Sequence, residues 1–175
     1  LKNIPGTRKE RYKIMTRTMP KKGKLSLEMM YQTTGTQINL DYISENDFKK
    51  KFKLISNLVP LSIAIFANSP FKEGKMNGYL SYRSRVWHDT ARGGLPKIYL
   101  EGMDFEKYAD MVIKAPLLFL FKNNKHLSVS NKTFKDFMEG KIKKINNSKA
   151  TLDDLKNHLS TIFTEVRLKQ YIEIR

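Results

Sequence analysis

The last eleven residues of the chain, EVRLKQYIEIR, alternate between apolar and polar side chains. This period of two is typical of a half-buried β-strand, and here Arg167, Glu173 and Arg175 share the polar face. A carboxylate is a good ligand for Mg²⁺, and the guanidinium fork of arginine suits phosphates and carboxylates. The spacing therefore allows Glu173 to hold a metal beside a phosphate bound by Arg175. It equally allows an ordinary ion pair on a solvated strand face.

A second polar face is predicted for residues 28–42, whose pattern indicates one long strand with alternating faces. Thr33, Gln37 and Asn39 line up on one face of this strand. Such side chains are too polar for a packed core, so we expect an open sheet face here, as at the end of the chain.

A third group of candidate residues lies in the segment SYRSRVWHDTARGG, which contains three arginines and the only tryptophan of the chain. Arg83 and Trp87 are four residues apart, so they share a face if the segment is helical. An arginine beside an aromatic wall is a common way to hold a small carboxylate. The alternative is an aromatic side chain that anchors a loop, with the arginines in solvent.

The composition bounds the class of protein. With 175 residues, 40% of them hydrophobic, the chain can form one domain with a core. Its net charge of +16 suits nucleic acid, a membrane surface or a phosphorylated ligand, or else reflects a lysine-rich solvated surface. No basic stretch is interleaved with aromatic residues, which argues against a nucleic-acid-binding module. The chain has no cysteine, which excludes disulfides and zinc–thiolate sites and favours a cytoplasmic location.

Helical periodicity and capping signals predict six helices. Their expected bounds are 7–18, 45–67, 82–88, 104–114, 132–138 and 151–163. Ser44 with Asp47, and Thr151 with Asp154, have the spacing of capping boxes. Pro60 predicts a kink or a break in the second helix.

Apolar runs on either side of residues 122–125 predict a β-hairpin. The two amphipathic strands predicted above, at residues 28–42 and 165–175, lie towards the two ends of the chain. Hairpins and long strands mixed with helices favour an α+β fold with an antiparallel sheet. We expect one sheet face to pack under helices and the other to stay open.

Five stretches, in this order, resemble the plant-type and proteobacterial glutamate–cysteine ligases and together cover nearly the whole chain. The stretches are RYKIMTRTMPKKGKLSLEMMYQT, TQINLDYISENDFKKKF, FANSPFKEGKMNGYLSYRSRVW, FEKYADMVIKAPLLF and HLSTIFTEVRLKQYIEIR. The resemblance implies a partial catalytic domain similar to that of glutamine synthetase, in which an antiparallel sheet is cupped around the active site with helices packed behind.

The resemblance also implies an activity. It predicts ligation of the side-chain carboxylate of L-glutamate to the amine of L-cysteine, giving γ-glutamylcysteine through an acyl phosphate. ATP would be consumed, and Mg²⁺ would be required. Neither a nucleic acid nor a membrane would be a partner. A ligase of the same fold with another amine acceptor is the alternative, because the acceptor pocket cannot be identified from these residues.

By similarity to the family's motifs, five residues are expected to bind glutamate. Arg83 and Trp87 match the glutamate-binding segment, Arg92 and Thr33 would lie close behind them, and Met30 would form part of the pocket wall.

The other expected site residues would serve the metal and the nucleotide. Glu173 and Gln37 would be magnesium ligands, and Asn39 would face the nucleotide. Arg175 would bind and stabilise the transferring phosphate, and Arg167 would assist in the same region.

The sequence departs from the family in three ways. The loop after Trp87 is shorter, and Thr34 stands near a position where plant members have a cysteine, so redox control through that thiol is absent. The family extends beyond both ends of the chain, so we expect residues 1–175 to be a single partial catalytic domain, truncated at both ends. Upstream residues would supply further acidic metal ligands.

Overall fold

A computed structural model of the chain describes residues 4–90, 93–129, 131–145 and 148–175. The described residues divide into two compact units, each with its own packed interior. The first unit is built mainly from Met19–Asp104 and Phe163–Arg175, and the second from Pro5–Thr18 and Phe105–Ile162.

The first unit contains helices, two small antiparallel sheets and most of the candidate site residues. Its elements are η1 (Met19–Lys21), α2 (Ser26–Gln32), β1 (Ile38–Leu40), α3 (Glu45–Ile65), β2 (Phe71–Lys72), β3 (Lys75–Met76), α4 (Tyr82–His88), α5 (Lys97–Glu101), β6 (Val166–Leu168) and β7 (Ile172–Ile174). The elements of the second unit are α1 (Glu10–Thr18), α6 (Phe105–Lys114), β4 (Phe119–Lys122), β5 (Lys125–Ser128), α7 (Phe134–Met138), η2 (Lys143–Ile145) and α8 (Leu152–Leu159).

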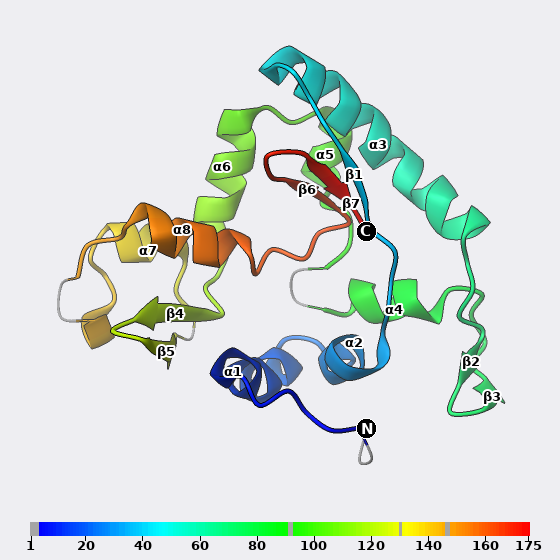
Figure 1. Ribbon diagram of the computed structural model, residues 1–175, viewed down its shortest axis with the longest axis horizontal. Coiled ribbons are helices and arrows are strands. Elements are labelled where there is room, and N and C mark those ends of the chain that lie inside the picture. The colour runs from blue at the N-terminus through cyan, green and yellow to red at the C-terminus, as the bar shows by residue number, and fades with distance from the viewer. Residues whose placement is uncertain (1–3, 91–92, 130, 146–147) are drawn as a thin grey trace. The chain divides into compact units, whose positions relative to one another are not determined.

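The closing segment forms a β-hairpin, so the prediction of one continuous strand over residues 165–175 is wrong. β6 and β7 pair antiparallel, and β1 pairs with the other edge of β7, which gives the sheet order β1–β7–β6 (Figure 1). The register places Asn39, Glu173 and Arg167 opposite one another across the three strands. Directly opposite residues of antiparallel strands point to the same face, so the polar residues still share one face.

The prediction of a long strand over residues 28–42 is also wrong. Residues 26–32 form the helix α2, and only Ile38–Leu40 form a strand. The segment SLEMMYQ contains leucine, glutamate and two methionines, which favour helix, whereas Thr33 adopts extended backbone (φ −112, ψ 140) and ends it. Thr33 therefore does not line up with Gln37 and Asn39 on one strand.

The helix α3 covers the β1–β7–β6 sheet in the first unit. The Ser44 side chain accepts the Asp47 N–H at 3.2 Å, which confirms Ser44 as the N-cap. The Asp47 carboxylate accepts the N–H of Ile43 at 3.1 Å, one residue before the partner expected for a capping box. The buried residues of α3 recur at helical spacing and so form one face: Phe48, Phe52, Ile55 and Val59. The helix contacts α5, β6 and β7.

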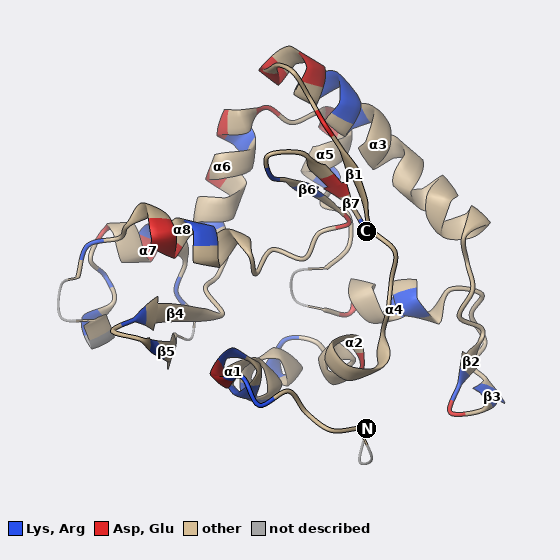
Figure 2. Ribbon diagram, viewed as in Figure 1, with Lys and Arg blue, Asp and Glu red and all other residues tan. Residues whose placement is uncertain are grey.

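The predicted break at Pro60 does not occur, because α3 runs without interruption from Glu45 to Ile65. Figure 2 shows that charged residues gather on the first half of α3 and that its second half is free of them.

Several other predicted elements are confirmed. The helix α4 has the expected bounds, and β4 and β5 form the expected hairpin around Asn123 and Asn124. Both asparagines have positive φ (50 and 56), as the turn of a two-residue hairpin requires. Thr151 and Asp154 form a capping box at the start of α8, although α8 ends at Leu159 and not near residue 163.

The second unit has an apolar core of its own. The buried members are Leu117, Leu120, Val129, Phe134, Phe137, Ile142 and Ile145. The chain is thus an α+β protein with small antiparallel sheets, as the sequence predicted. No helix within the described ranges is both long and apolar enough to span a membrane.

Candidate functional site

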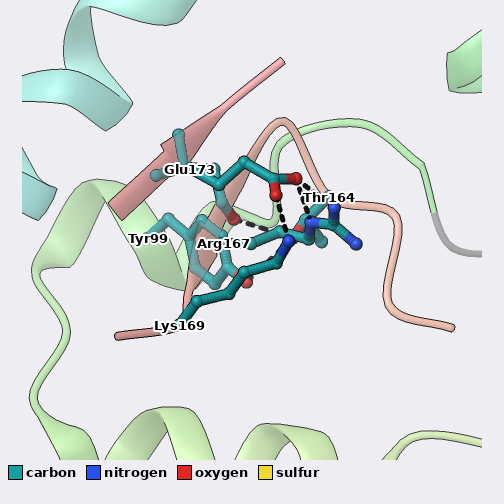
Figure 3. A network of polar contacts seen from close by, with 6 residues as sticks. Tyr99, Thr164, Arg167, Lys169 and Glu173 are labelled. Carbon is teal, nitrogen blue, oxygen red and sulfur yellow. Dashed lines mark hydrogen bonds and ion pairs between the residues drawn. The ribbon is translucent and has the colours of Figure 1, made fainter. Parts of the chain in front are cut away.

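The polar face of the β1–β7–β6 sheet carries a buried ion-pair network centred on Glu173 (Figure 3). Arg167 donates from Nε to Glu173 Oε1 at 2.7 Å, and its Nη2 donates to the same oxygen. Lys169 donates to the other oxygen, Oε2. Burial alone would raise the pKa of Glu173, but the hydrogen bonds from Lys169 and Arg167 outweigh it and hold that pKa below its usual value of 4.5.

Tyr99 and Thr164 lie beside this network in the same view (Figure 3). Their hydroxyl oxygens are 3.2 Å apart, and Thr164 also donates to the carbonyl oxygen of Val166 at 2.8 Å. These contacts link α5 to the start of β6. Buried hydroxyl contacts therefore fix the backbone just before β6, the strand that carries Arg167.

Two arginines, Arg83 and Arg175, lie over the indole of Trp87, and Arg175 also bonds through its N–H to the Glu165 carbonyl oxygen. We call Arg83, Trp87, Glu165 and Arg175 the arginine–tryptophan cluster. The guanidinium carbon of Arg175 lies 4.7 Å from the Trp87 ring centroid, and that of Arg83 lies 5.5 Å from it. Both distances are within the range of cation–π contacts. Trp87 itself is buried against the ring of Phe163.

Arg175 remains a cation at neutral pH. Burial and the nearby charge of Arg167 lower the pKa of Arg175 to about 10, which is still well above neutrality. The cluster therefore presents two guanidinium groups next to an aromatic wall. This arrangement can bind a carboxylate or a phosphate.

Arg83 is held by α2 and by the loop that follows it. Its Nε donates to the carbonyl oxygen of Thr34 at 2.9 Å. A Cβ on Gly35 would lie 2.8 Å from Nη2 of Arg83, so only glycine leaves room for the guanidinium where it lies. The Arg83 backbone is fixed in turn, because its N–H donates to the Ser69 hydroxyl at 3.0 Å.

Glu165 belongs to this cluster, although the sequence did not single it out. Its side chain is only 4% exposed. Burial raises the pKa of Glu165, and the charges of Arg83, His88 and Arg175 only partly oppose this rise. The available signal was its position in the closing segment, where it falls on the same polar face as Arg167, Glu173 and Arg175.

The structure brings the predicted site residues together in two groups. Asn39 lies opposite Glu173 in the sheet, and Gln37 immediately precedes β1; both are exposed. Arg83 and Trp87 share one face of α4, and Arg175 contacts the same indole.

The remaining predicted site residues are Met30, Thr33 and Arg92. Met30 is half-buried on α2. The Thr33 hydroxyl is engaged by its own helix, donating to the carbonyl oxygen of Met29 at 2.8 Å. Arg92 lies outside the residues that the structure describes.

The described residues do not fit a complete magnesium site. Within the described ranges, no three His, Asp or Glu side chains come together in a group able to hold a metal ion. Both oxygens of Glu173 are bound by Arg167 and Lys169. The metal-binding roles of Glu173 and Gln37 therefore stay predictions.

Several known proteins that are similar to this chain are described as glutamate–cysteine ligases. It is 47% identical over its whole length to glutamate–cysteine ligase B, chloroplastic, of Oryza sativa subsp. japonica, of which it covers 36%. It is 47% identical to glutamate–cysteine ligase, chloroplastic, of Nicotiana tabacum and 44% identical to that of Arabidopsis thaliana, covering 34% of each.

The names of these relatives contradict the predicted cytoplasmic location, because each of the three is described as chloroplastic. The prediction was wrong because a lack of cysteine separates reducing from oxidising compartments but does not separate the cytosol from another reducing compartment.

The family is identified by a match that runs along almost the entire chain. The model of glutamate-cysteine ligase family 2 matches residues 2–175. The chain spans about a third of the length of the curated relatives that it matches. With both the family model and relatives at 44–47% identity in agreement, the chain belongs to the glutamate–cysteine ligase family.

Proposed function

We propose that the full natural polypeptide carrying this sequence joins the side-chain carboxylate of L-glutamate to the amine of L-cysteine, with hydrolysis of ATP to ADP and phosphate. The observation that carries the proposal is the convergence of Arg83 and Arg175 on the Trp87 ring in a chain of this family. The relatives' names support γ-glutamylcysteine formation, the first step of glutathione synthesis, as the reaction.

The chemistry needs cations more than it needs a nucleophile from the protein. The substrate carboxylate attacks the γ-phosphorus of ATP, which brings several negative charges together, and the resulting acyl phosphate is attacked by the amine with loss of phosphate. Catalysis of such a transfer comes mainly from positioning and charge neutralisation. Arg175, charged at neutral pH, would neutralise the transferring phosphate. Arg83 and Trp87 would hold the amino-acid substrate.

The finer predictions are part of the same proposal. The β1–β7–β6 sheet would belong to a larger antiparallel sheet, cupped as in glutamine synthetase, and residues 1–175 would be part of one catalytic domain. Asn39 would face the nucleotide, with Arg167 near the phosphates.

The proposal also includes the metal and the remaining contacts to glutamate. Mg²⁺ would supply further charge neutralisation, with Glu173 and Gln37 as ligands only if residues outside the described set complete the site. Met30 and Thr33 would line the glutamate side, and Arg92, outside the described residues, is proposed there by similarity alone.

Two alternatives differ in their chemistry. A ligase with another amine acceptor shares every residue named above, so only the acceptor distinguishes it. A nucleic-acid-binding module needs a concentrated basic surface, whereas Figure 2 shows lysine and arginine on many elements of each unit.

The test is the Arg83→Ala variant of the full natural polypeptide. If Arg83 binds the substrate carboxylate, the KM for L-glutamate should rise by about 10- to 100-fold, the worth of a charged hydrogen bond. ADP formation that requires both L-glutamate and L-cysteine is the measurement. Arg85→Ala is the matched control, because Arg85 is exposed on the same helix. An unchanged glutamate dependence in Arg83→Ala would count against the assignment.

A further inference from the structure

Three buried polar atoms of the arginine–tryptophan cluster have no hydrogen-bond partner within the described part of the chain. They are Glu165 Oε1, Trp87 Nε1 and Arg175 Nε. Leaving a polar group buried and unpaired costs about 1–3 kcal/mol, so native proteins rarely keep one without a reason. The Arg175 guanidinium lies over the Trp87 ring, and the Arg175 N–H donates to the Glu165 carbonyl oxygen, so the three atoms belong to neighbouring residues. Three such atoms in one small group of residues are an observation that a bound ligand would explain.

The unpaired atoms differ in chemistry, and the difference describes the ligand. Glu165 offers an anionic acceptor, whereas Trp87 and Arg175 offer donors, one of them cationic. A ligand that satisfies all of them carries a cationic donor close to an anionic acceptor. L-Glutamate has this arrangement: its α-ammonium is the cationic donor, and its side-chain carboxylate, which Arg175 would meet during phosphate transfer, is the anionic acceptor. A dicarboxylate without an amine would meet the arginines equally well but would leave Glu165 unpaired.

We propose that Glu165 binds the α-ammonium group of the amino-acid substrate and makes the site select an amino acid over the same acid without the amine. This inference rests on the proposed function, because it assigns a residue to the recognition of that reaction's substrate. Glu165 is then a specificity-determining residue.

The backbone around Glu165 is fixed without help from its carboxylate. Its N–H donates to the carbonyl oxygen of Gly94 at 3.0 Å, and its carbonyl oxygen accepts the N–H of Arg175 at 2.9 Å. These bonds place Glu165 opposite Arg175, one residue beyond the Val166–Ile174 pair of the hairpin. A carboxylate needed only for folding would be expected to bind a donor, whereas Glu165 Oε1 binds none among the described residues.

The experiment compares L-glutamate with glutarate, which is glutamate without the amine. Dissociation constants are measured by calorimetry on the full natural polypeptide with Mg²⁺ and a non-hydrolysable ATP analogue, for the wild type, Glu165→Gln and Glu165→Asp. Gln keeps the shape of the side chain and removes the charge, whereas Asp keeps the charge. The matched control is Glu106→Gln, because Glu106 is exposed on α6.

The expected result is a loss of affinity for L-glutamate but not for glutarate. Glu165→Gln should weaken L-glutamate binding by about 10- to 100-fold and leave glutarate binding within about twofold of the wild type. Glu165→Asp should retain part of the preference for glutamate, and Glu106→Gln should change neither ligand.

Other outcomes overturn the inference in recognisable ways. An equal loss for both ligands in Glu165→Gln would mean that Glu165 only positions the arginines, and no loss would mean that it does not meet the substrate. If the wild type binds no L-glutamate, the proposed function fails and this inference fails with it. If the wild type binds L-glutamate and glutarate equally well, the inference alone fails.

Discussion

At the scale of single residues, the position of Arg83 depends on a glycine that faces it. A Cβ on Gly35 would lie 2.8 Å from Nη2 and 3.0 Å from Nε of Arg83. Both atoms are at the far end of a flexible side chain, which can move aside at little cost. Gly35 thus matters more for where the guanidinium lies than for whether the chain folds.

Gly35→Ala should therefore separate binding from stability. The added methyl group displaces the Arg83 guanidinium, so the KM for L-glutamate should rise several-fold, while the free energy of unfolding should change by less than about 1 kcal/mol. Enzyme kinetics and urea denaturation of the full natural polypeptide measure the two quantities. Gly74→Ala is unsuitable as a control, because Gly74 has a φ of +78 and alanine would be strained there. Arg85→Ala is therefore used again as the control. A normal KM in Gly35→Ala would contradict the role given to Gly35.

The residues of the candidate site were only partly predictable. Arg83 and Trp87 could be paired from their spacing, because four residues bring two side chains to one face of a helix. Glu165 was missed because alternation assigns a side chain to a face but does not say how deeply that face is buried. Its burial depends on segments that are distant in sequence, among them α4 and the loop through Gly94.

At the scale of elements, the start of α8 combines a helix cap with a buried ion pair. Asp154 accepts hydrogen bonds from the N–H and the hydroxyl of Thr151, at 2.8 and 2.7 Å, and from Lys122 at 2.6 Å. The carboxylate is almost fully buried, and the Lys122 ammonium lies over the Phe137 ring. One side chain therefore links α8 to β4 in the second unit.

We expect Asp154→Asn to destabilise the chain by about 2–3 kcal/mol, because it leaves the Lys122 ammonium without its anion in a mostly buried place. The matched control is Asp136→Asn at the start of α7, which has the same capping box with Thr133 but whose carboxylate forms no ion pair among the described residues. Urea denaturation should show a clearly smaller loss for Asp136→Asn. Equal losses would mean that the pair with Lys122 adds nothing.

Two long strands were predicted wrongly because a short sequence pattern is compatible with more than one structure. In the closing segment, apolar and polar residues continue to alternate in β6 and β7 on either side of the turn. A hairpin and a single strand therefore have the same sequence pattern. In residues 28–42, a short helix followed by a short strand was mistaken for alternation, since brief apolar patterns fit either period.

At the scale of the whole molecule, paired carboxylates should govern stability in acid. Glu28, Asp154 and Glu173 each accept hydrogen bonds from a lysine; these bonds outweigh burial and hold their pKa values below the usual 4.5 for Glu and 3.8 for Asp. A lowered pKa in the folded state contributes stability above the unfolded-state pKa. That stability is lost as pH falls through the folded-state pKa.

The free energy of unfolding should therefore fall as pH is lowered from about 5 to about 3. Glu165 acts in the opposite direction, because its pKa is raised: its contribution is present below about 4.5 and is lost as pH rises through its folded-state pKa. Urea denaturation across this range gives the slope. Glu173→Gln should flatten this slope by removing one titrating group, whereas Glu165→Gln should remove a loss of stability that sets in as pH rises above about 4.5. An identical slope in Glu173→Gln would exclude Glu173 as a contributor.

The sequence by itself determined the features that depend on neighbours along the chain. These are the caps at Ser44 and Thr151, the helix that pairs Arg83 with Trp87, the α+β class and the family. Each follows from spacings of three or four residues or from motifs that stay contiguous in the chain.

Only the tertiary structure decided which distant segments meet. It paired β1 with β7 across more than a hundred residues, folded the closing segment back on itself, and buried Glu165 beside Arg175. The physical reason is that pairing and burial depend on contacts made after the chain has folded back, whereas a local pattern only restricts which face of an element each side chain occupies.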